Sequence, residues 1–195
     1  MALMAAVAAM DGPDERRDTI TAARAGDLAA FDLLMRQHQR LVLATALRLT
    51  GNMEDAQDIS QEVFLRLYKN LGKVKAAEAL PAWLYRVTVN ACHDLRRRKP
   101  ESADGTAGDL VAGDVDAHTA LTQAERRRVL ELSLHILPEK ERAALVLRDL
   151  EGLSTGEVAR ILGSSEATVR SQISKARAKI HDFVERYFSP RKRRL

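Results

Sequence analysis

Apolar residues recur at helical spacing along most of the chain, and no segment shows the apolar–polar alternation that predicts a half-buried β-strand. In the first half the pattern predicts helices within 33–49, over 54–71 and over about 81–98. In the second half it predicts helices over 122–136, from 138 to about 150, over 154–162 and over 166–180. The sequence therefore predicts an all-α fold.

Residues 101–116 interrupt this helical pattern. The segment holds three glycines and four aspartates, and it has no basic or aromatic residue. Such a composition buries too little apolar surface to fold alone, so we expect a flexible acidic linker between two small helical bundles. The predicted organisation is a tail at 1–24, a bundle at 25–99, the linker at 100–121, a bundle at 122–188 and a basic tail at 189–195.

The distribution of charge along the chain indicates a class of binding partner. The net charge of +4 conceals a charge of −2 on residues 1–30, +5 on residues 31–100, −5 on residues 101–120 and +6 on residues 121–195. Two basic modules on either side of an acidic strip indicate binding to a polyanion, of which nucleic acid is the leading example.

Several classes of protein are excluded. A single cysteine, Cys92, allows neither a disulfide framework nor a Cys-based zinc site, and it fits a reducing compartment such as the cytoplasm. No apolar run reaches the roughly 20 residues that span a bilayer. Residues 1–10 are apolar but lack a basic start, so we expect neither a signal peptide nor direct membrane insertion.

The strongest local motif lies in the second module. Ser154 and Glu157 have the spacing of a capping box, which starts a helix. Gly163 supplies a left-handed stop, and Ser164 or Ser165 can cap the next helix. Two helices joined by a tight glycine-containing turn predict a helix-turn-helix.

The second helix of this motif has two distinct faces. Val169, Ile173, Ala176 and Ile180 share one face and are expected to pack inward. The opposite face carries small, hydroxyl and basic side chains: Ala167, Ser171, Ser174, Lys175 and Ala178, flanked by Arg170 and Lys179. That face suits the grooves of duplex DNA, whereas the simpler alternative is a solvated basic helix in an ordinary bundle.

An acidic stripe lies within the basic first module. Asp55, Asp58 and Glu62 share one face of the helix at 54–71, with Gln61 beside them. The stripe predicts binding to a basic protein surface, with a merely solvated face as the alternative. No histidine has the Glu-x-x-His spacing of carboxylate-bundle metal sites, so no metal or other cofactor is expected.

The helix at 81–98 combines aromatic and basic residues. Trp83 and Tyr85 stand near its start, Tyr68 is close in sequence, and the helix ends in Arg96, Arg97, Arg98 and Lys99. Rings and cations together suit unpaired nucleic acid, which binds by stacking and charge. The alternatives are core packing for Trp83 and ordinary surface charge for the basic run. Cys92 and His93 are adjacent and point to different sides of the helix, and no enzymatic activity is predicted.

Taken together, these motifs resemble the extracytoplasmic-function (ECF) type of bacterial RNA polymerase sigma factor. In the first module the resemblance rests on Ala30-Phe31, on the segment 55–66, on Trp83 to Arg86, and on Asn90, Asp94-Leu95 and Arg96 to Arg98. In the second module it rests on Leu137-Pro138, Lys140 to Arg142, the segment 150–154, Glu157 to Ala159, Leu162-Gly163, Thr168 to Ser171 and Ala176-Arg177.

The resemblance implies roles for particular residues. Asp58, Gln61 and Glu62 match the surface that binds the RNA polymerase core enzyme. The positions that match the region engaging the melted minus-ten element are Trp83, Asn90, Asp94, Arg96, Arg97 and Arg98. The positions that match the helix reading the minus-thirty-five element of promoter DNA are Arg170, Ser171, Ser174 and Lys175. An anti-sigma factor is a further implied partner.

Two departures and two alternatives accompany this resemblance. Met35, Leu43 and Leu80 occupy positions where rings are frequent in the family, and the two ends of the chain have no clear counterpart. The first alternative is a conventional helix-turn-helix regulator that binds duplex DNA without polymerase. The second is an adaptor that binds polymerase but does not open promoters.

Overall fold

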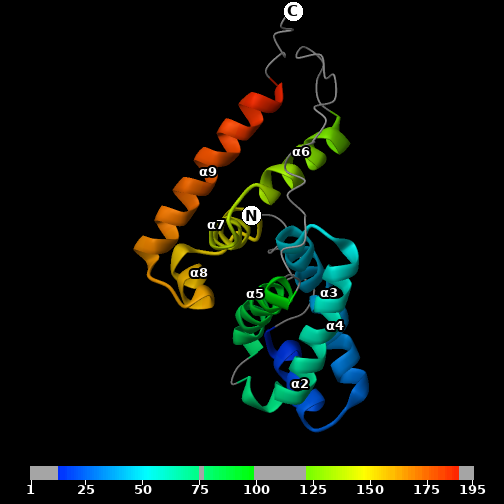
Figure 1. Cartoon of the computed structure of the whole chain (residues 1–195). Helices are drawn as coiled ribbons and strands as arrows, with labels where there is room; N and C mark the ends of the chain where they lie inside the picture. The colour runs from blue at the N-terminus through cyan, green and yellow to red at the C-terminus, as the bar shows by residue number, and fades with distance from the viewer. Residues whose placement is uncertain (1–12, 75–76, 99–121, 189–195) are drawn as a thin grey trace, which may run out of the picture.

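The structure is a computed structural model, and it describes residues 13–74, 77–98 and 122–188. The predicted acidic linker and basic tail lie outside the described residues. Every regular element within the described ranges is helical, and the helices form two bundles (Figure 1). The prediction of an all-α fold with two helical modules is confirmed.

The first bundle is built around three long helices. Its elements are α2 (Pro13–Arg24), α3 (Leu28–Thr50), α4 (Met53–Asn70), the short 3₁₀ turns η1 (Leu71–Lys73) and η2 (Ala77–Ala79), and α5 (Leu80–Arg98). The apolar faces of α3, α4 and α5 meet, so that Val42, Leu67 and Leu84 have no exposed surface. This apolar core supplies most of the stability of the bundle.

Side-chain and glycine caps determine where these helices begin and end. The Asp27 carboxylate accepts hydrogen bonds from the amides of Ala29 and Ala30 and so starts α3. Gly51, at φ 72°, ends the same helix in the left-handed conformation. The Asn52 side chain then accepts from the amide of Asp55 at the start of α4. The predicted helix end near Gly51 and Asn52 is confirmed.

Helix α2 was not predicted from the sequence. It is strongly polar, and its described buried side chains are few, with Ile20 and Ala23 as the apolar ones. The helix packs on α3 and holds the turn region after α4. Its Arg24 Nε donates to the Leu71 carbonyl (3.3 Å), and Arg17 pairs with Glu78 (2.8 Å).

The second bundle begins after the linker. Its elements are α6 (Gln123–His135), α7 (Glu139–Leu145), the π-helical segment η3 (Val146–Leu150), α8 (Thr155–Leu162) and α9 (Glu166–Phe188). The sequence pattern predicted one helix from Pro138 to about Leu150. The structure instead widens after Leu145, because the amide of Glu151 donates to the carbonyl of Val146 (2.9 Å) across a five-residue turn.

Helix α9 is longer than predicted. Its apolar face was expected to end near Ile180, but the helix continues to Phe188. The added turns carry a small aromatic cluster, in which the rings of Phe183 and Tyr187 lie 5.9 Å apart and those of Tyr187 and Phe188 lie 5.0 Å apart.

The two bundles are in contact. Helix α5 packs against α8, and α3 packs against α6, α7 and η3. The buried apolar residues of both bundles belong to one connected cluster. In this arrangement α9 lies on the outer side of the second bundle (Figure 1).

Candidate nucleic-acid interface

The helix-turn-helix is formed by α8, a tight turn and α9. The Ser154 hydroxyl accepts from the amide of Glu157 (3.3 Å), and the Glu157 carboxylate accepts from the amide of Ser154 (2.8 Å). The Ser154 hydroxyl also donates to the Glu157 carboxylate (2.6 Å), and the hydrogen bonds that this carboxylate accepts from the hydroxyl and the amide of Ser154 lower the pKa of Glu157. Gly163 adopts φ 61° and ends α8. The Ser165 hydroxyl then accepts from the amide of Thr168 (3.1 Å), so Ser165 is the capping serine.

Helix α9 presents its predicted outer face to solvent. Val169, Ile173 and Ala176 are buried, which confirms the inward face. All four residues predicted to read the minus-thirty-five element are exposed: Arg170, Ser171, Ser174 and Lys175. Ala167 and Ala178 are exposed beside them. The face is thus a strip of small side chains and hydroxyls between cations, which can approach a groove closely.

Ion pairs divide the cations of α9 into two groups. Arg177 makes a bidentate pair with Asp149 (2.8 and 2.9 Å), which raises the pKa of its guanidinium, and Lys179 pairs with Glu141 (2.9 Å). These two pairs attach α9 to its own bundle. Arg170 pairs only with Glu166, one turn away (3.1 Å), and Lys175 makes no ion pair within the described residues. Lys175 and Arg170 are therefore the cations most available to DNA.

The acidic stripe on α4 is only partly free. Asp58 and Gln61 are exposed. Glu62 is half-buried and pairs with Arg66 in the next turn (2.5 Å). Arg66 also lies 3.9 Å from Asp94 of α5. The structure thus joins a residue predicted to bind polymerase to one predicted to contact DNA, which the sequence pattern did not predict.

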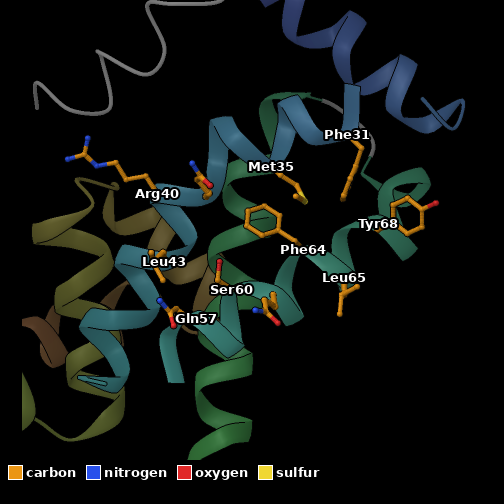
Figure 2. A pocket seen from close by; sticks show the side chains of 11 residues that line it. Phe31, Met35, Arg40, Leu43, Gln57, Ser60, Phe64, Leu65 and Tyr68 are labelled. Carbon is orange, nitrogen blue, oxygen red and sulfur yellow. The ribbon is translucent and has the colours of Figure 1, made fainter. Parts of the chain in front are cut away.

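An apolar groove lies beside Gln61 on the same side of the first bundle. Figure 2 shows its lining, which α3 and α4 contribute. The groove has a volume of about 1050 Å³. Its apolar lining residues are Phe31, Met35, Leu43, Phe64, Leu65 and Tyr68. Leu65 is 61% exposed, and the Tyr68 ring packs edge-on against Phe31 (5.1 Å). The signal for this groove was available in the sequence, since Leu65 and Tyr68 fall outside the buried face of α4.

The two aromatic residues of helix α5 have different surroundings. Trp83 is half-buried and packs against the core, which agrees with the core-packing alternative. Tyr85 is only 1% exposed and lies against the second bundle, so it is not available to stack on a base in this arrangement. Tyr68 lies in the groove on α4 rather than beside the basic run.

The other predicted residues of α5 lie toward its C-terminal end. Asn90 is exposed, as are Arg96, Arg97 and Arg98, and Asp94 is half-buried between Arg66 and Arg97. Three cations in the last turn of a helix favour the helix dipole and leave a positive end for phosphates. Within the described ranges, no group of three or more His, Cys, Asp or Glu residues has the geometry of a metal site.

Comparison with known families gives the same division into two modules. Residues 34–100 match the model for Sigma-70 region 2, and residues 125–180 match the model for Sigma-70, region 4. The RNA polymerase sigma-H factor of Pseudomonas aeruginosa is 32% identical over 178 residues, covering 86% of this chain and 92% of the relative. The ECF RNA polymerase sigma factor SigM of Mycobacterium tuberculosis strain H37Rv is 36% identical over 171 residues, covering 87% and 85%.

The chain belongs to the ECF sigma factors of RNA polymerase. It functions in promoter-specific initiation of transcription, and sigma factors are initiation factors rather than catalysts. The two family matches fall in the two bundles, so region 2 spans most of α3 to α5 and region 4 contains the helix-turn-helix.

Solved structures support the same fold for this sigma factor. CnrH, in complex with the cytosolic domain of CnrY, aligns with a TM-score of 0.65 at 26% identity, covering 88% of this chain and 97% of that one. RpoE of Bartonella quintana, solved with the anti-sigma factor NepR, aligns with a TM-score of 0.62 at 20% identity, covering 80% and 96%. No helix in the described ranges is long and apolar enough to span a membrane.

Proposed function

We propose that this chain directs core RNA polymerase to promoters through three separate surfaces. Asp58, Gln61 and Glu62 on α4 bind the core enzyme. The α5 residues Trp83, Asn90, Asp94, Arg96, Arg97 and Arg98 engage the melted minus-ten element. The α9 residues Arg170, Ser171, Ser174 and Lys175 read the minus-thirty-five duplex. The exposed hydroxyl and basic face of α9 is the observation that carries the proposal, because the neighbouring Arg177 and Lys179 are committed to the bundle.

The charge pattern explains how one small chain can bind two unlike partners. Asp58 and Gln61 present negative charge and hydrogen-bonding capacity on α4, whereas the end of α5 and the outer face of α9 are basic. Opposite charges on separate faces steer each partner to its own surface. The reaction is performed by the polymerase, and this chain acts with it in the cytoplasm.

An anti-sigma factor is part of the proposal. Among the structural neighbours, RpoE of Bartonella quintana was solved with the anti-sigma factor NepR, and CnrH was solved with the cytosolic domain of CnrY. The groove of Figure 2 is next to Gln61, so a protein that covers the groove would also compete with core polymerase for α4.

Reversal of charge on α4 tests the core-binding surface. In the variant Asp58→Lys, affinity for core polymerase should fall at least about tenfold with the helical content unchanged, because an exposed acidic contact becomes a repulsive one. Asp18→Lys is a matched control, since Asp18 is exposed on α2 and its substitution changes the net charge equally. Unchanged affinity of the Asp58 variant would show that the stripe is only solvated surface.

Run-off transcription on a promoter library tests the complete function. Core polymerase with the purified chain should produce new start sites that core polymerase alone does not. Tight binding of the isolated chain to duplex operators, with no new start sites, would instead favour a conventional helix-turn-helix regulator. Binding to polymerase without promoter opening would favour an adaptor.

A further inference from the structure

The second helix of the helix-turn-helix begins with an acidic residue. Glu166 is the first residue of α9, and its side chain is 55% exposed. In helix-turn-helix proteins the first residues of this helix reach base edges, and phosphates line the groove that the helix enters. A carboxylate at this place weakens binding to any duplex through charge repulsion. Glu166 therefore opposes the general affinity for DNA that the cations of α9 supply.

The two oxygens of the Glu166 carboxylate have different neighbours. Oε2 accepts a hydrogen bond from Nη1 of Arg170, one turn along the helix (3.1 Å). Oε1 lies over Gly156 in the first turn of α8, so closely that a Cβ on Gly156 would come within 3.2 Å of it. The side chain thus lies between the two helices of the motif. It contacts α8 through one oxygen and holds Arg170 through the other.

The stability of the helix does not account for this ion pair. An exposed pair at this spacing adds little to stability, and an acid in the first turn interacts with the helix dipole whether or not it is paired. Arg177 and Lys179 have carboxylate partners that are mostly covered, and they attach α9 to its own bundle. In the pair of Glu166 with Arg170 both side chains are more than half exposed. This pair is therefore accessible to DNA.

The geometry of the Arg170 guanidinium determines which contact it can make next. Glu166 accepts from Nη1, and Nε and Nη2 have no hydrogen-bond partner within the described ranges. Their N–H groups lie side by side and form the fork that donates to O6 and N7 of a guanine in the major groove. Contact with a phosphate needs no such orientation, and the nearby carboxylate repels the phosphate. An Arg170 held by Glu166 thus favours a base edge over the DNA backbone.

We infer that Glu166 is a specificity-determining residue of this sigma factor. It orients Arg170 toward a guanine of the minus-thirty-five element and opposes contact between Arg170 and phosphate. Specificity is a difference between affinities, and a repulsive group that weakens binding to the wrong sequences increases it. Glu166 acts through Arg170, so it is a positioning residue. The inference rests on the proposed reading of the minus-thirty-five duplex by α9.

Binding of the complex with core polymerase to promoter duplexes tests the inference. The probes are a promoter selected from the run-off library, the same duplex with each base pair of the minus-thirty-five element replaced in turn, and an unrelated duplex. Glu166→Gln keeps the size of the side chain and removes its charge. In this variant the preference for guanine at one position should fall about tenfold. The salt dependence of binding to the unrelated duplex should steepen by about one phosphate contact, because Arg170 is released to the backbone.

Two further variants separate this role from a general effect of charge. Glu185→Gln removes the same charge from the exposed pair of His181 with Glu185, near the other end of α9, and should leave the preference for guanine unchanged. Arg170→Ala removes the residue that Glu166 orients. In that background Glu166→Gln should cause no further loss of base preference, because the two residues act as one unit. Circular dichroism should show the same helical content for every variant.

Three results would overturn the inference. The first is an unchanged base preference in Glu166→Gln, and the second is an equal gain in affinity on every duplex. The third is the same loss of preference whether residue 170 is arginine or alanine, which would show that Glu166 does not act through Arg170. Failure of the proposed function gives a different result, because the unsubstituted complex would then bind all of the minus-thirty-five duplexes equally.

Discussion

Arg142 offers a demanding test of how this fold is held together. Its three hydrogen bonds go to the carbonyls of Leu49, His135 and Leu137, and the side chain is 5% exposed. In Arg142→Met the apolar stem is retained and all three donors are lost. A buried acceptor without a partner costs about 1–3 kcal/mol, so three carbonyls account for about 3–9 kcal/mol.

Part of that loss is offset, because the variant no longer buries a cation without a carboxylate partner in hydrogen-bond contact. We therefore expect the free energy of unfolding to fall by about 3 kcal/mol, which corresponds to a decrease in Tm of roughly 6–12 °C for a chain of this size. Urea unfolding followed by circular dichroism measures the whole chain. Trp83 fluorescence, from the one tryptophan, reports the first bundle.

A half-buried arginine nearby provides the control. The Arg148 side chain on η3 makes no hydrogen bond or ion pair with the described residues, so Arg148→Met should change the free energy of unfolding by no more than about 0.5 kcal/mol. Equal stability of the Arg142 and Arg148 variants would refute the reasoning. It would mean that water satisfies the three carbonyls as well as the guanidinium does.

Three further predictions concern a cap, a thiol and a DNA contact. Ser154→Ala should lower the free energy of unfolding by about 1 kcal/mol at pH 7. This deficit should shrink at acid pH, because the lowered pKa of Glu157 contributes stability that is lost as the pH falls through that pKa. A deficit equal at pH 7 and pH 3, measured by urea unfolding, would contradict this prediction. Burial raises the pKa of the Cys92 thiol to about 12. At pH 8 a thiol-reactive disulfide should therefore label the native chain about a thousandfold more slowly than the urea-unfolded chain. Equal labelling rates would show that the thiol is accessible. Lys175→Ala should weaken binding of the polymerase complex to promoter DNA, and Ala178→Ser on the same face is a control that keeps the charge. If the lysine contacts phosphate, the slope of the logarithm of the binding constant against the logarithm of the salt concentration should fall by about 1. A loss of about 1–3 kcal/mol confined to particular sequences would show base reading instead.

Local signals in the sequence predicted much of the fold. Capping pairs such as Ser154 with Glu157, and helix stops such as Gly51 and Gly163, act within a few residues and were identified with their observed roles. The inward face of α9 followed from the spacing of Val169, Ile173 and Ala176. These features depend on short-range geometry, which one sequence contains in full.

Features that depend on distant partners were not predicted. Tyr85 was interpreted as a stacking residue, but its hydroxyl meets Glu151, 66 positions later in the chain. Arg142 reaches Leu49, 93 positions earlier. Helix α2 was missed because its apolar positions are too few to stand out, and its order comes from packing on α3. Nothing local to these residues identifies their partners.

The site predictions divide in a similar way. Exposure of Arg170, Ser171, Ser174 and Lys175 agrees with the predicted outer face, although their role in reading DNA stays a prediction. The link from Glu62 through Arg66 toward Asp94 arises from the packing of α4 against α5 and has no signature in either helix alone.

The most direct test of the central claim is the opening of promoter DNA. Core polymerase and this chain should make thymines around the minus-ten element reactive to permanganate, and the reactivity should be lost when either protein is omitted. Asp58→Lys and Lys175→Ala should each reduce it, while Asp18→Lys should leave it unchanged. Full binding of the complex to promoter duplex without any permanganate-reactive thymine would contradict the claim that this chain starts transcription by capturing the melted strand.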